Sequence, residues 1–325
     1  MLISPARRTL CESSRGHGGC AITRQSLTES ITDIGRKLLT LEQWCIGWAR
    51  IAISDFLDDP LSAQFSWLKP STSLEILADP FGLEENGKFL ILAEHLKHGA
   101  TKGRLVLIDP HAEPPQPSLL LSRPFRLSYP FLVEDDAQRY VVPEQAESGT
   151  LAFYRLTPNG LDGPAAVTDG LDAIDPTFLR HDGLWWLFCT RLCSGPNGPL
   201  FLHYSETLLG PYRSHPKNPI VTDRGHARPA GRIIRLGETL LRPAQDCEHT
   251  YGAAIVLCEI DRLTTELYRE RPVRRLEPRD IKGGFRSGLH TLDHTPNHVI
   301  LDTKRFAFHP FAAPIKMRNR LRDWE

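Results

Sequence analysis

The sequence predicts an all-β fold, a five-bladed β-propeller with a short N-terminal helix and a disordered N-terminus. Three observations predict it. A hairpin pattern recurs five times along the chain, and successive copies start 50, 46, 53 and 62 residues apart, close to the size of one propeller blade. No helical pattern of 10–15 residues separates the strands, which argues against a two-domain α/β chain or a β-sandwich.

Each copy of the hairpin has the same order of residue types. A polar or aromatic residue leads and, in four of the five copies, proline follows at once. A short apolar strand, a polar or glycine turn, a second apolar strand and a closing polar residue come next. The leading residues are Asp79, Tyr129, Asp175, Arg228 and His290. The trailing residues are Glu94, Glu144, Thr190, Gln245 and Asp302.

Further strands complete each unit. They are expected at 103–110, 150–156, 199–206 and 252–260. Each unit is then a sheet of three or four short antiparallel strands. The aromatic and β-branched stretch 43–53 lies outside the repeats, and the last unit lacks an outer strand, so we expect 43–53 to close the ring on the last blade.

The rest of the chain is short. We expect a disordered tail at 1–25, a helix at 26–42, one propeller domain at 43–310 and a basic tail at 311–325. The basic tail is interpreted as a solvated helix, with docking or membrane-surface contact as the alternative.

Composition excludes several classes of function. Lys plus Arg and Asp plus Glu balance at 39 each, so no nucleic-acid partner is expected. No apolar run has the length of a membrane span, and the N-terminus lacks the apolar core of a signal peptide. Seven cysteines without a C-x-x-C favour a reducing cytoplasm. No nucleotide-binding motif occurs and no cofactor or metal is expected; Pro296 breaks the helical spacing of the histidines nearby.

The propeller geometry gathers the leading residues at one place. The innermost strand of each blade lines a central channel, so the five leading residues should form a ring around one mouth. A hairpin returns to the level of its start, which puts Glu94, Glu144 and Gln245 in a second circle behind this ring. Such a ring suits a sugar ligand, and paired carboxylates also suit glycosidic chemistry.

Structural interpretations compete at several of these positions. Asp79 before a proline is also typical of a turn. Glu144 can pair structurally with Arg228 or Arg242, and those two arginines can be substrate clamps or buried partners of acids. His290 is more typical of a satisfied histidine than of a metal ligand.

The motifs together resemble a known family. They are ADPFG at 78–82, SYPF at 128–131, PEQ at 143–145, DPTF at 175–178, LGPYRSHPKNP at 209–219, ARPAGRI at 227–233, RPAQD at 242–246 and YG at 251–252. In order and spacing they resemble the N-terminal domain family of glucosamine inositolphosphorylceramide transferases, over roughly 43–310. That resemblance implies a five-bladed propeller related to family 43 and family 32 glycoside hydrolases.

The resemblance carries over to only some residues. It implies that Asp79 matches the hydrolase base or nucleophile and that Asp175 matches the aspartate that tunes the acid. Arg228 stands where those hydrolases have their general-acid glutamate, which departs from a hydrolase. The plant transferases carry the glycosyltransferase in a separate C-terminal domain, which we do not expect in this chain.

Two functional hypotheses follow. The first is a glycan- or glycolipid-headgroup-active enzyme with Asp79, Glu144 and Asp175 as catalytic carboxylates. Its expected substrate-binding residues are Arg228, Arg242, His290, Tyr129, Glu94 and Gln245. The alternative is a non-catalytic carbohydrate- or sugar-phosphate-binding module that assists a separate glycosyltransferase or formyltransferase. A purely structural scaffold would leave the polar ring unexplained.

Overall fold

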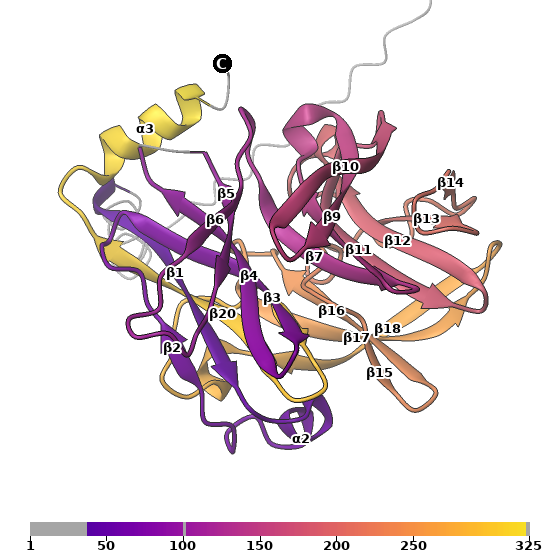
Figure 1. The fold of residues 1–325 in the computed structure, drawn as a ribbon, viewed down its shortest axis with the longest axis horizontal. Coiled ribbons are helices and arrows are strands. Elements are labelled where there is room, and N and C mark those ends of the chain that lie inside the picture. Colours follow the sequence, from indigo (N-terminus) through magenta and orange to yellow (C-terminus); the bar gives the residue numbers. More distant parts are fainter. Residues whose placement is uncertain (1–37, 100–101, 323–325) are drawn as a thin grey trace, which may run out of the picture.

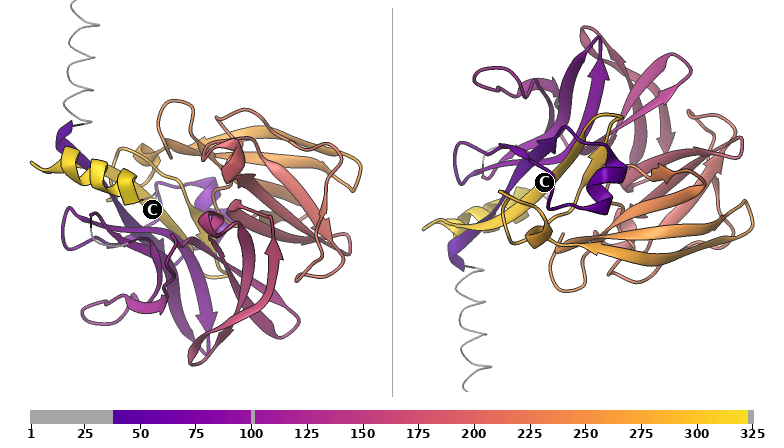
Figure 2. Two further views of the ribbon diagram at one scale, coloured as in Figure 1. Left: turned by 90° about the horizontal axis from the view of Figure 1, so that it is seen from above. Right: turned by 90° about the horizontal axis from the view of Figure 1, so that it is seen from below.

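The computed structural model describes residues 38–99 and 102–322 and has five four-stranded antiparallel sheets. The sheets are arranged around a common centre, as Figure 1 and Figure 2 show. The predicted five-bladed propeller is therefore confirmed.

Blades 1–3 each consist of four consecutive strands. Blade 1 contains β3 (Glu75–Glu85), β4 (Lys88–Lys97), β5 (Arg104–Ile108) and β6 (Ser118–Leu121). Blade 2 contains β7 (Ser128–Asp135), β8 (Gln138–Glu144), β9 (Thr150–Thr157) and β10 (Gly160–Asp169). Blade 3 contains β11 (Ala173–His181), β12 (Leu184–Arg191), β13 (Phe201–Ser205) and β14 (Arg213–Ser214).

Blade 4 also consists of four consecutive strands, β15 (Ile234–Leu236), β16 (Thr239–Asp246), β17 (Ala254–Leu263) and β18 (Tyr268–Leu276).

Blade 5 joins the two ends of the ring. Blade 5 runs in the order β19 (Leu292–His294), β20 (Val299–Phe308), β1 (Thr40–Ala49) and β2 (Ser66–Leu68). Strand β1 pairs with β20 from Thr40 opposite Phe308 to Ala49 opposite Val299. The expected closure of the last blade by the N-terminal strand is confirmed.

The flanking segments differ in detail from the expectation. The tail expected at 1–25 and most of the helix expected at 26–42 lie outside the described residues, and residues 40–42 belong to β1. The strand expected at 43–53 ends earlier, at Ala49, and α2 spans Ile53–Asp58. Helix α3 (Ala312–Arg322) occupies most of the basic tail. Among the described residues, no helix has both the length and the apolarity to span a bilayer.

Turn residues and bulges shape the inner hairpins of blades 1–3. Asn86-Gly87 and Asp182-Gly183 have positive φ at both positions, as two-residue hairpin turns require. Strand pairing shifts between Ala78 and Phe81 in blade 1, and equivalent shifts occur in blades 2 and 3. The residues in these bulges have φ near 50°: Asp79, Tyr129 and Asp175. A bulge redirects the side chain of its extra residue and leaves the backbone N–H of that residue out of the strand pairing. The N–H groups of these three residues are therefore free to bind side chains near the channel mouth.

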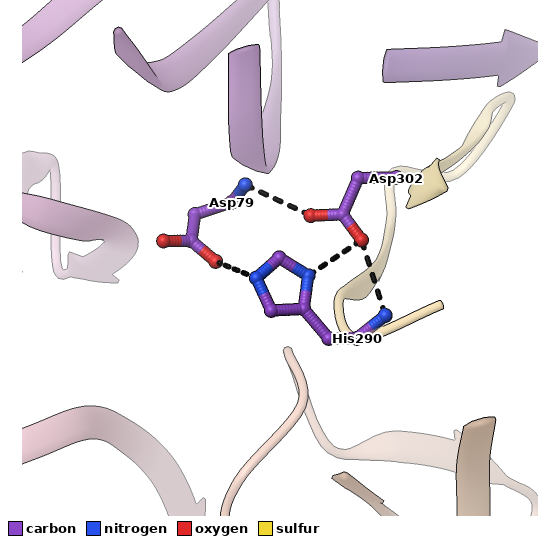
Figure 3. A group of neighbouring side chains, drawn as sticks. All are labelled: Asp79, His290 and Asp302. Atoms are coloured by element: carbon purple, nitrogen blue, oxygen red, sulfur yellow. Dashed lines mark hydrogen bonds and ion pairs between the residues drawn. The ribbon is translucent and has the colours of Figure 1, made fainter. Parts of the chain in front are cut away.

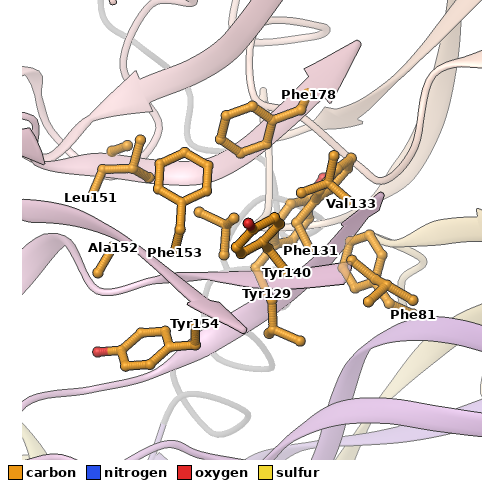
Figure 4. Packing of buried hydrophobic residues seen from close by; sticks show 14 of the residues in the cluster. Phe81, Tyr129, Phe131, Val133, Tyr140, Leu151, Ala152, Phe153, Tyr154 and Phe178 are labelled. Atoms are coloured by element: carbon orange, nitrogen blue, oxygen red, sulfur yellow. The ribbon is translucent and has the colours of Figure 1, made fainter. Parts of the chain in front are cut away.

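The largest apolar cluster packs between blades 1, 2 and 3. Figure 4 shows Phe81 of β3, Tyr129 and Phe131 of β7 and Phe178 of β11 in contact around the inner strands. The rings of Phe81 and Tyr129 meet edge to face with centroids 4.9 Å apart. This packing holds the inner strands, and therefore the bulges, in fixed positions.

Candidate functional site

The leading and trailing residues of each inner hairpin lie at one end of the molecule. Register pairs Ala78 with Glu94 in blade 1 and Ser128 with Glu144 in blade 2. Blade 3 repeats the arrangement with Ile174 opposite Thr190. In these three blades, the residue just before the leading residue pairs with the trailing residue. The leading and trailing residues of a hairpin therefore lie at the same level, as the hairpin geometry predicted.

The acids near this end bind the backbone of neighbouring blades. The N–H of Asp79 donates to Asp302 Oδ2 at 3.0 Å, and the N–H of Asp175 donates to Glu144 Oε2 at 3.4 Å. The N–H of Tyr129 donates to Asp79 Oδ2 at 3.2 Å. These N–H groups are the ones that the bulges release. The acids therefore satisfy backbone donors that would otherwise be buried without a partner.

Asp79, His290 and Asp302 form a buried network (Figure 3). His290 Nδ1 lies 2.7 Å from Asp302 Oδ1, and His290 Nε2 lies 3.3 Å from Asp79 Oδ1. Thr291 also donates its hydroxyl to Asp79 Oδ1 at 3.0 Å. Burial alone would lower the pKa of His290, but the charges of Asp302 and Asp79 outweigh burial and raise that pKa. Burial, with Glu94 and Asp175 nearby, raises the pKa of Asp79 to about 7.

This network is also the metal-compatible group in the described part of the chain. One possible ligand atom from each of Asp79, His290 and Asp302 lies within 4.8 Å of the others. The same atoms already bond to one another or to Thr291, and a metal would have to displace the proton on a histidine nitrogen. The arrangement is satisfied as a hydrogen-bonded network.

A second network joins blades 3 and 4. Arg228 donates Nε to Asp175 Oδ2 at 2.6 Å and Nη2 to Asp175 Oδ1 at 3.3 Å. Gln245 donates Nε2 to Asp175 Oδ2 at 2.8 Å. The Arg228 guanidinium also lies 3.7 Å from Glu144 Oε2. Burial and the charge of Asp175 raise the pKa of Glu144 to about 8, although Arg228 acts in the opposite direction.

Two predicted binding residues point elsewhere. Arg242 is fully buried on β16, where it pairs with Glu270 of β18 at 2.6 Å and donates to the His226 carbonyl at 2.7 Å. The Tyr129 ring is also fully buried, and its hydroxyl lies 2.7 Å from Thr177 Oγ1. Arg242 is therefore a buried partner of an acid, and Tyr129 has no open face for a ligand.

A cavity of about 390 Å³ opens at the channel mouth between blades 5 and 1. Glu94 and His290 line it, whereas Asp79, Glu144, Asp175 and Arg228 do not. The remaining lining residues come from β1, β3, β4, three loops and α3: Glu42, Trp44, Ile76, Ala78, Leu96, His98, Lys102, Gly103, Arg126, Tyr251 and Lys316. Only two of the nine predicted site residues thus reach this cavity.

Aromatic side chains form one wall of the cavity. Trp44 stacks on His290 with ring centroids 3.9 Å apart, and Tyr251 meets His290 edge-on at 5.2 Å. Gly252 has φ +58°, and a Cβ there would lie 2.7 Å from His290 Cβ and 3.0 Å from the Trp44 ring. The YG motif of the sequence therefore serves this wall: the tyrosine lines it, and the glycine lets the backbone approach.

Cations also line the cavity. Arg126 donates Nε and Nη2 to the two Glu94 oxygens at 3.2 Å each, and nearly half of its side chain is exposed. Lys102 lies 3.5 Å from Glu147. Sequence reasoning missed Trp44, Lys102, Arg126 and Tyr251. Only the YG motif offered a signal for any of them, since the other three lie outside the repeated hairpins.

The sequence matches a family model over residues 65–293, described as glucosamine inositolphosphorylceramide transferase 1, N-terminal. The chain belongs to this family. Two curated members, both named glucosamine inositolphosphorylceramide transferase 1, show how far the similarity extends. The protein of Oryza sativa subsp. indica is 37% identical over 161 residues, which are 48% of this chain and 22% of that protein. The protein of Arabidopsis thaliana is 31% identical over 222 residues, 65% of this chain and 29% of that protein.

Two glycoside hydrolases are among the solved structures that match this chain. A thermostable family-43 glycoside hydrolase matches with a TM-score of 0.49 at 13% identity, over 67% of this chain and 84% of that chain. The exo-β-1,3-galactanase 1,3Gal43A of Clostridium thermocellum matches with a TM-score of 0.48 at 14% identity, over 64% of this chain and 53% of that chain. This chain spans less than a third of the length of the curated family members that it matches.

Proposed function

We propose that this propeller binds, rather than cleaves, a carbohydrate ligand that carries an anionic group, in the cavity at the channel mouth. The observation that carries the proposal is that the leading acids are buried and bonded within the protein, whereas the cavity is lined by other residues. The side chains of Asp79 and Asp175 are 6% and 2% exposed and are bonded inside the protein. Glycosidic catalysis needs two carboxyl groups open to the substrate on either side of the bond.

The cavity itself has the chemistry of a recognition site. Trp44 and Tyr251 line the cavity, and aromatic residues are common in the lining of ligand sites. Three cations line the cavity, Lys102, Arg126 and Lys316, together with His290, whose pKa the nearby acids raise, against the two acids Glu42 and Glu94. This excess of positive charge favours a phosphate or carboxylate on the ligand. The name of the relatives, glucosamine inositolphosphorylceramide transferase 1, points to an inositol phosphate headgroup as the first ligand to test.

Calorimetric titration with myo-inositol 1-phosphate tests the proposal, with unphosphorylated myo-inositol alongside. We expect the phosphorylated ligand to bind more tightly because the cations contribute only to its affinity. Lys102→Gln should weaken its binding by about threefold to tenfold, since a partly exposed ion contact contributes up to about 1 kcal/mol. Lys217→Gln, at an exposed lysine of blade 3, should leave the affinity unchanged. Equal affinity for both ligands, or no binding of either, contradicts the proposal.

Glycoside hydrolysis is the second candidate function, and one observation favours it. Asp79 and Glu144 have pKa values raised to about 7 and about 8, and a carboxyl that stays protonated near neutral pH can donate a proton to a leaving group. The test is release of a chromogenic leaving group from aryl furanosides and aryl galactosides. Turnover by the wild type that Asp79→Asn abolishes would establish an enzyme and refute a purely binding role.

A further inference from the structure

A second cavity, of about 670 Å³, lies toward the other end of the inner strands from the proposed ligand cavity. Ile76, near the start of β3, lines the first cavity, whereas residues 82–84, near the end of the same strand, line the second. Leu132 of β7, Arg235 of β15 and His294 of β19 line it too, so four of the five inner strands reach it. We call it the distal cavity, and it shares no lining residue with the first.

Three arginines line the distal cavity: Arg139 on β8, Arg232 ahead of β15 and Arg235 on β15. Arg232 donates Nε to Asp293 Oδ1 at 2.9 Å and Nη1 to the Leu132 carbonyl at 3.0 Å. No acceptor in the described part of the chain binds its Nη2, and its side chain is 28% exposed. One terminal nitrogen of this guanidinium is therefore available to a ligand.

The other two arginines also keep a nitrogen for a ligand. Arg139 donates Nη1 to Glu85 at 2.8 Å and Nε to Glu134 at 3.4 Å, which leaves Nη2 without a partner among residues 38–99 and 102–322. Arg235 is exposed, and its Nη2 lies 3.5 Å from the Arg180 carbonyl, at the limit of hydrogen bonding. Three guanidinium groups thus share one cavity, and each has a donor that a ligand can use.

The acids at this cavity are already bonded to other groups. Glu84 accepts a hydrogen bond from Asn297 at 2.8 Å, and Asp293 is fully buried in its pairing with Arg232. Together with the two acids bonded to Arg139, they offset the arginine charges, so the attraction of an anion from a distance is weak. A bound anion is instead held by direct hydrogen bonds from the free guanidinium nitrogens.

Apolar side chains complete the wall of the distal cavity. They belong to Ile53, Leu83, Leu132 and Pro296. A pocket that combines a few positioned polar groups with apolar walls is typical of small-molecule sites. The lining therefore fits a ligand with anionic oxygens at one end and a small apolar group at the other.

We propose that the distal cavity binds the phosphate monoester of a small apolar organic group. A phosphate monoester has three terminal oxygens, so each of the three guanidinium groups can donate to one of them, whereas a carboxylate offers only two oxygens. The apolar residues pack against the organic group. This inference concerns a different cavity from the proposed function and does not depend on it.

Calorimetric titration of the full chain with phenyl phosphate tests the proposal, with inorganic phosphate alongside. We expect phenyl phosphate to bind more tightly, because inorganic phosphate leaves the apolar wall uncovered. Arg235→Gln should weaken the binding of phenyl phosphate about threefold to tenfold, as loss of an exposed ion contact does. Arg213→Gln, at a side chain 68% exposed on β14, should leave the affinity unchanged.

The combination of Arg139→Gln with Arg235→Gln removes two of the three guanidinium groups and should weaken binding further. No binding by the wild type, unchanged affinity of Arg235→Gln, or inorganic phosphate bound as tightly as phenyl phosphate would overturn the proposal. A loss with Lys102→Gln but not with Arg235→Gln would also overturn it, because the probe would then occupy the first cavity. Inositol phosphate should respond to Lys102→Gln and not to Arg235→Gln, so failure at one cavity is distinguishable from failure at the other.

Discussion

The leading residues of blades 1–3 and those of blades 4–5 lie in different backbone settings. In blades 1–3 the leading residue sits in a bulge of the inner strand with φ near 50° and precedes a proline. In blades 4 and 5 the inner strands are short, Ile234–Leu236 and Leu292–His294, and the leading residues Arg228 and His290 precede them. Repetition along the sequence therefore places five residues around one mouth without giving them one local geometry.

The two groups of blades are also complementary in charge. Blades 1–3 supply the acids Asp79 and Asp175 in the leading ring, and blades 4–5 supply the basic residues Arg228 and His290. Each basic residue binds an acid of the other group, Arg228 with Asp175 and His290 with Asp79. These pairs join neighbouring blades at the two junctions between the groups, blade 3 with blade 4 and blade 5 with blade 1. This pairing explains how so many charges stay buried at one end of the molecule.

The largest expected effect comes from removal of the cation of blade 4. Arg228→Met removes the cation that pairs with the buried Asp175 and leaves Gln245 donating to that carboxylate, so we expect a loss of about 3–5 kcal/mol in the free energy of unfolding. Urea denaturation at neutral pH measures this loss. Arg271→Met, which removes an exposed partner of Glu259, should cost at most about 1 kcal/mol.

A double variant sharpens this result. Arg228→Met together with Asp175→Asn removes both charges of the pair, so its cost should be well below that of Arg228→Met alone. A cost for Arg228→Met no greater than that for Arg271→Met would show that the pair between blades 3 and 4 does not hold the ring together.

A gain of stability is expected at the trailing acid of blade 2. Burial raises the pKa of Glu144 from 4.5 to about 8, so its stabilising protonated form is fully present below pH 4.5 and is lost as pH rises through 8. Glu144→Gln keeps a neutral side chain at all pH values, and its oxygen can still accept from the Asp175 N–H. The variant should match the wild type near pH 4 and exceed its stability by about 2 kcal/mol above pH 8. A difference that is independent of pH would contradict the raised pKa.

The five inner hairpins could be predicted from the sequence because each hairpin pattern is local. A leading residue, a proline, two short apolar strands and a turn recur within each unit, so blade number, ring closure and the common end of Asp79 and Glu94 were predictable. The hydrogen-bond partners were less predictable, since they depend on strand order and on side-chain direction. Arg242 was expected either as a substrate clamp in the channel or as a buried partner of an acid near it, and in the structure it pairs with Glu270 two strands away.

The cavity was largely hidden in the sequence for a related reason. Trp44 comes from β1, which joins blade 5 only after the chain has completed the ring, and Arg126 and Lys102 lie in connections that carry no repeat. An aromatic leading residue such as Tyr129 is equally compatible with a ligand platform and with a core residue. The structure shows the second arrangement, because the Tyr129 ring packs on Phe81 and leaves no open face.

The variant Tyr129→Phe tests a hydrogen bond between the two groups of blades, and it has the smallest expected effect on the free energy of unfolding. Its hydroxyl, from blade 2, accepts from the Gly231 N–H ahead of blade 4 at 2.7 Å and bonds Thr177 of blade 3. Tyr129→Phe leaves that buried N–H without its acceptor and should cost about 1 kcal/mol in the free energy of unfolding. Tyr140→Phe is the matched control in the same blade and cluster, since no described residue binds the Tyr140 hydroxyl. Equal stabilities of the two variants would mean that the tether between blades 2 and 4 contributes nothing to stability.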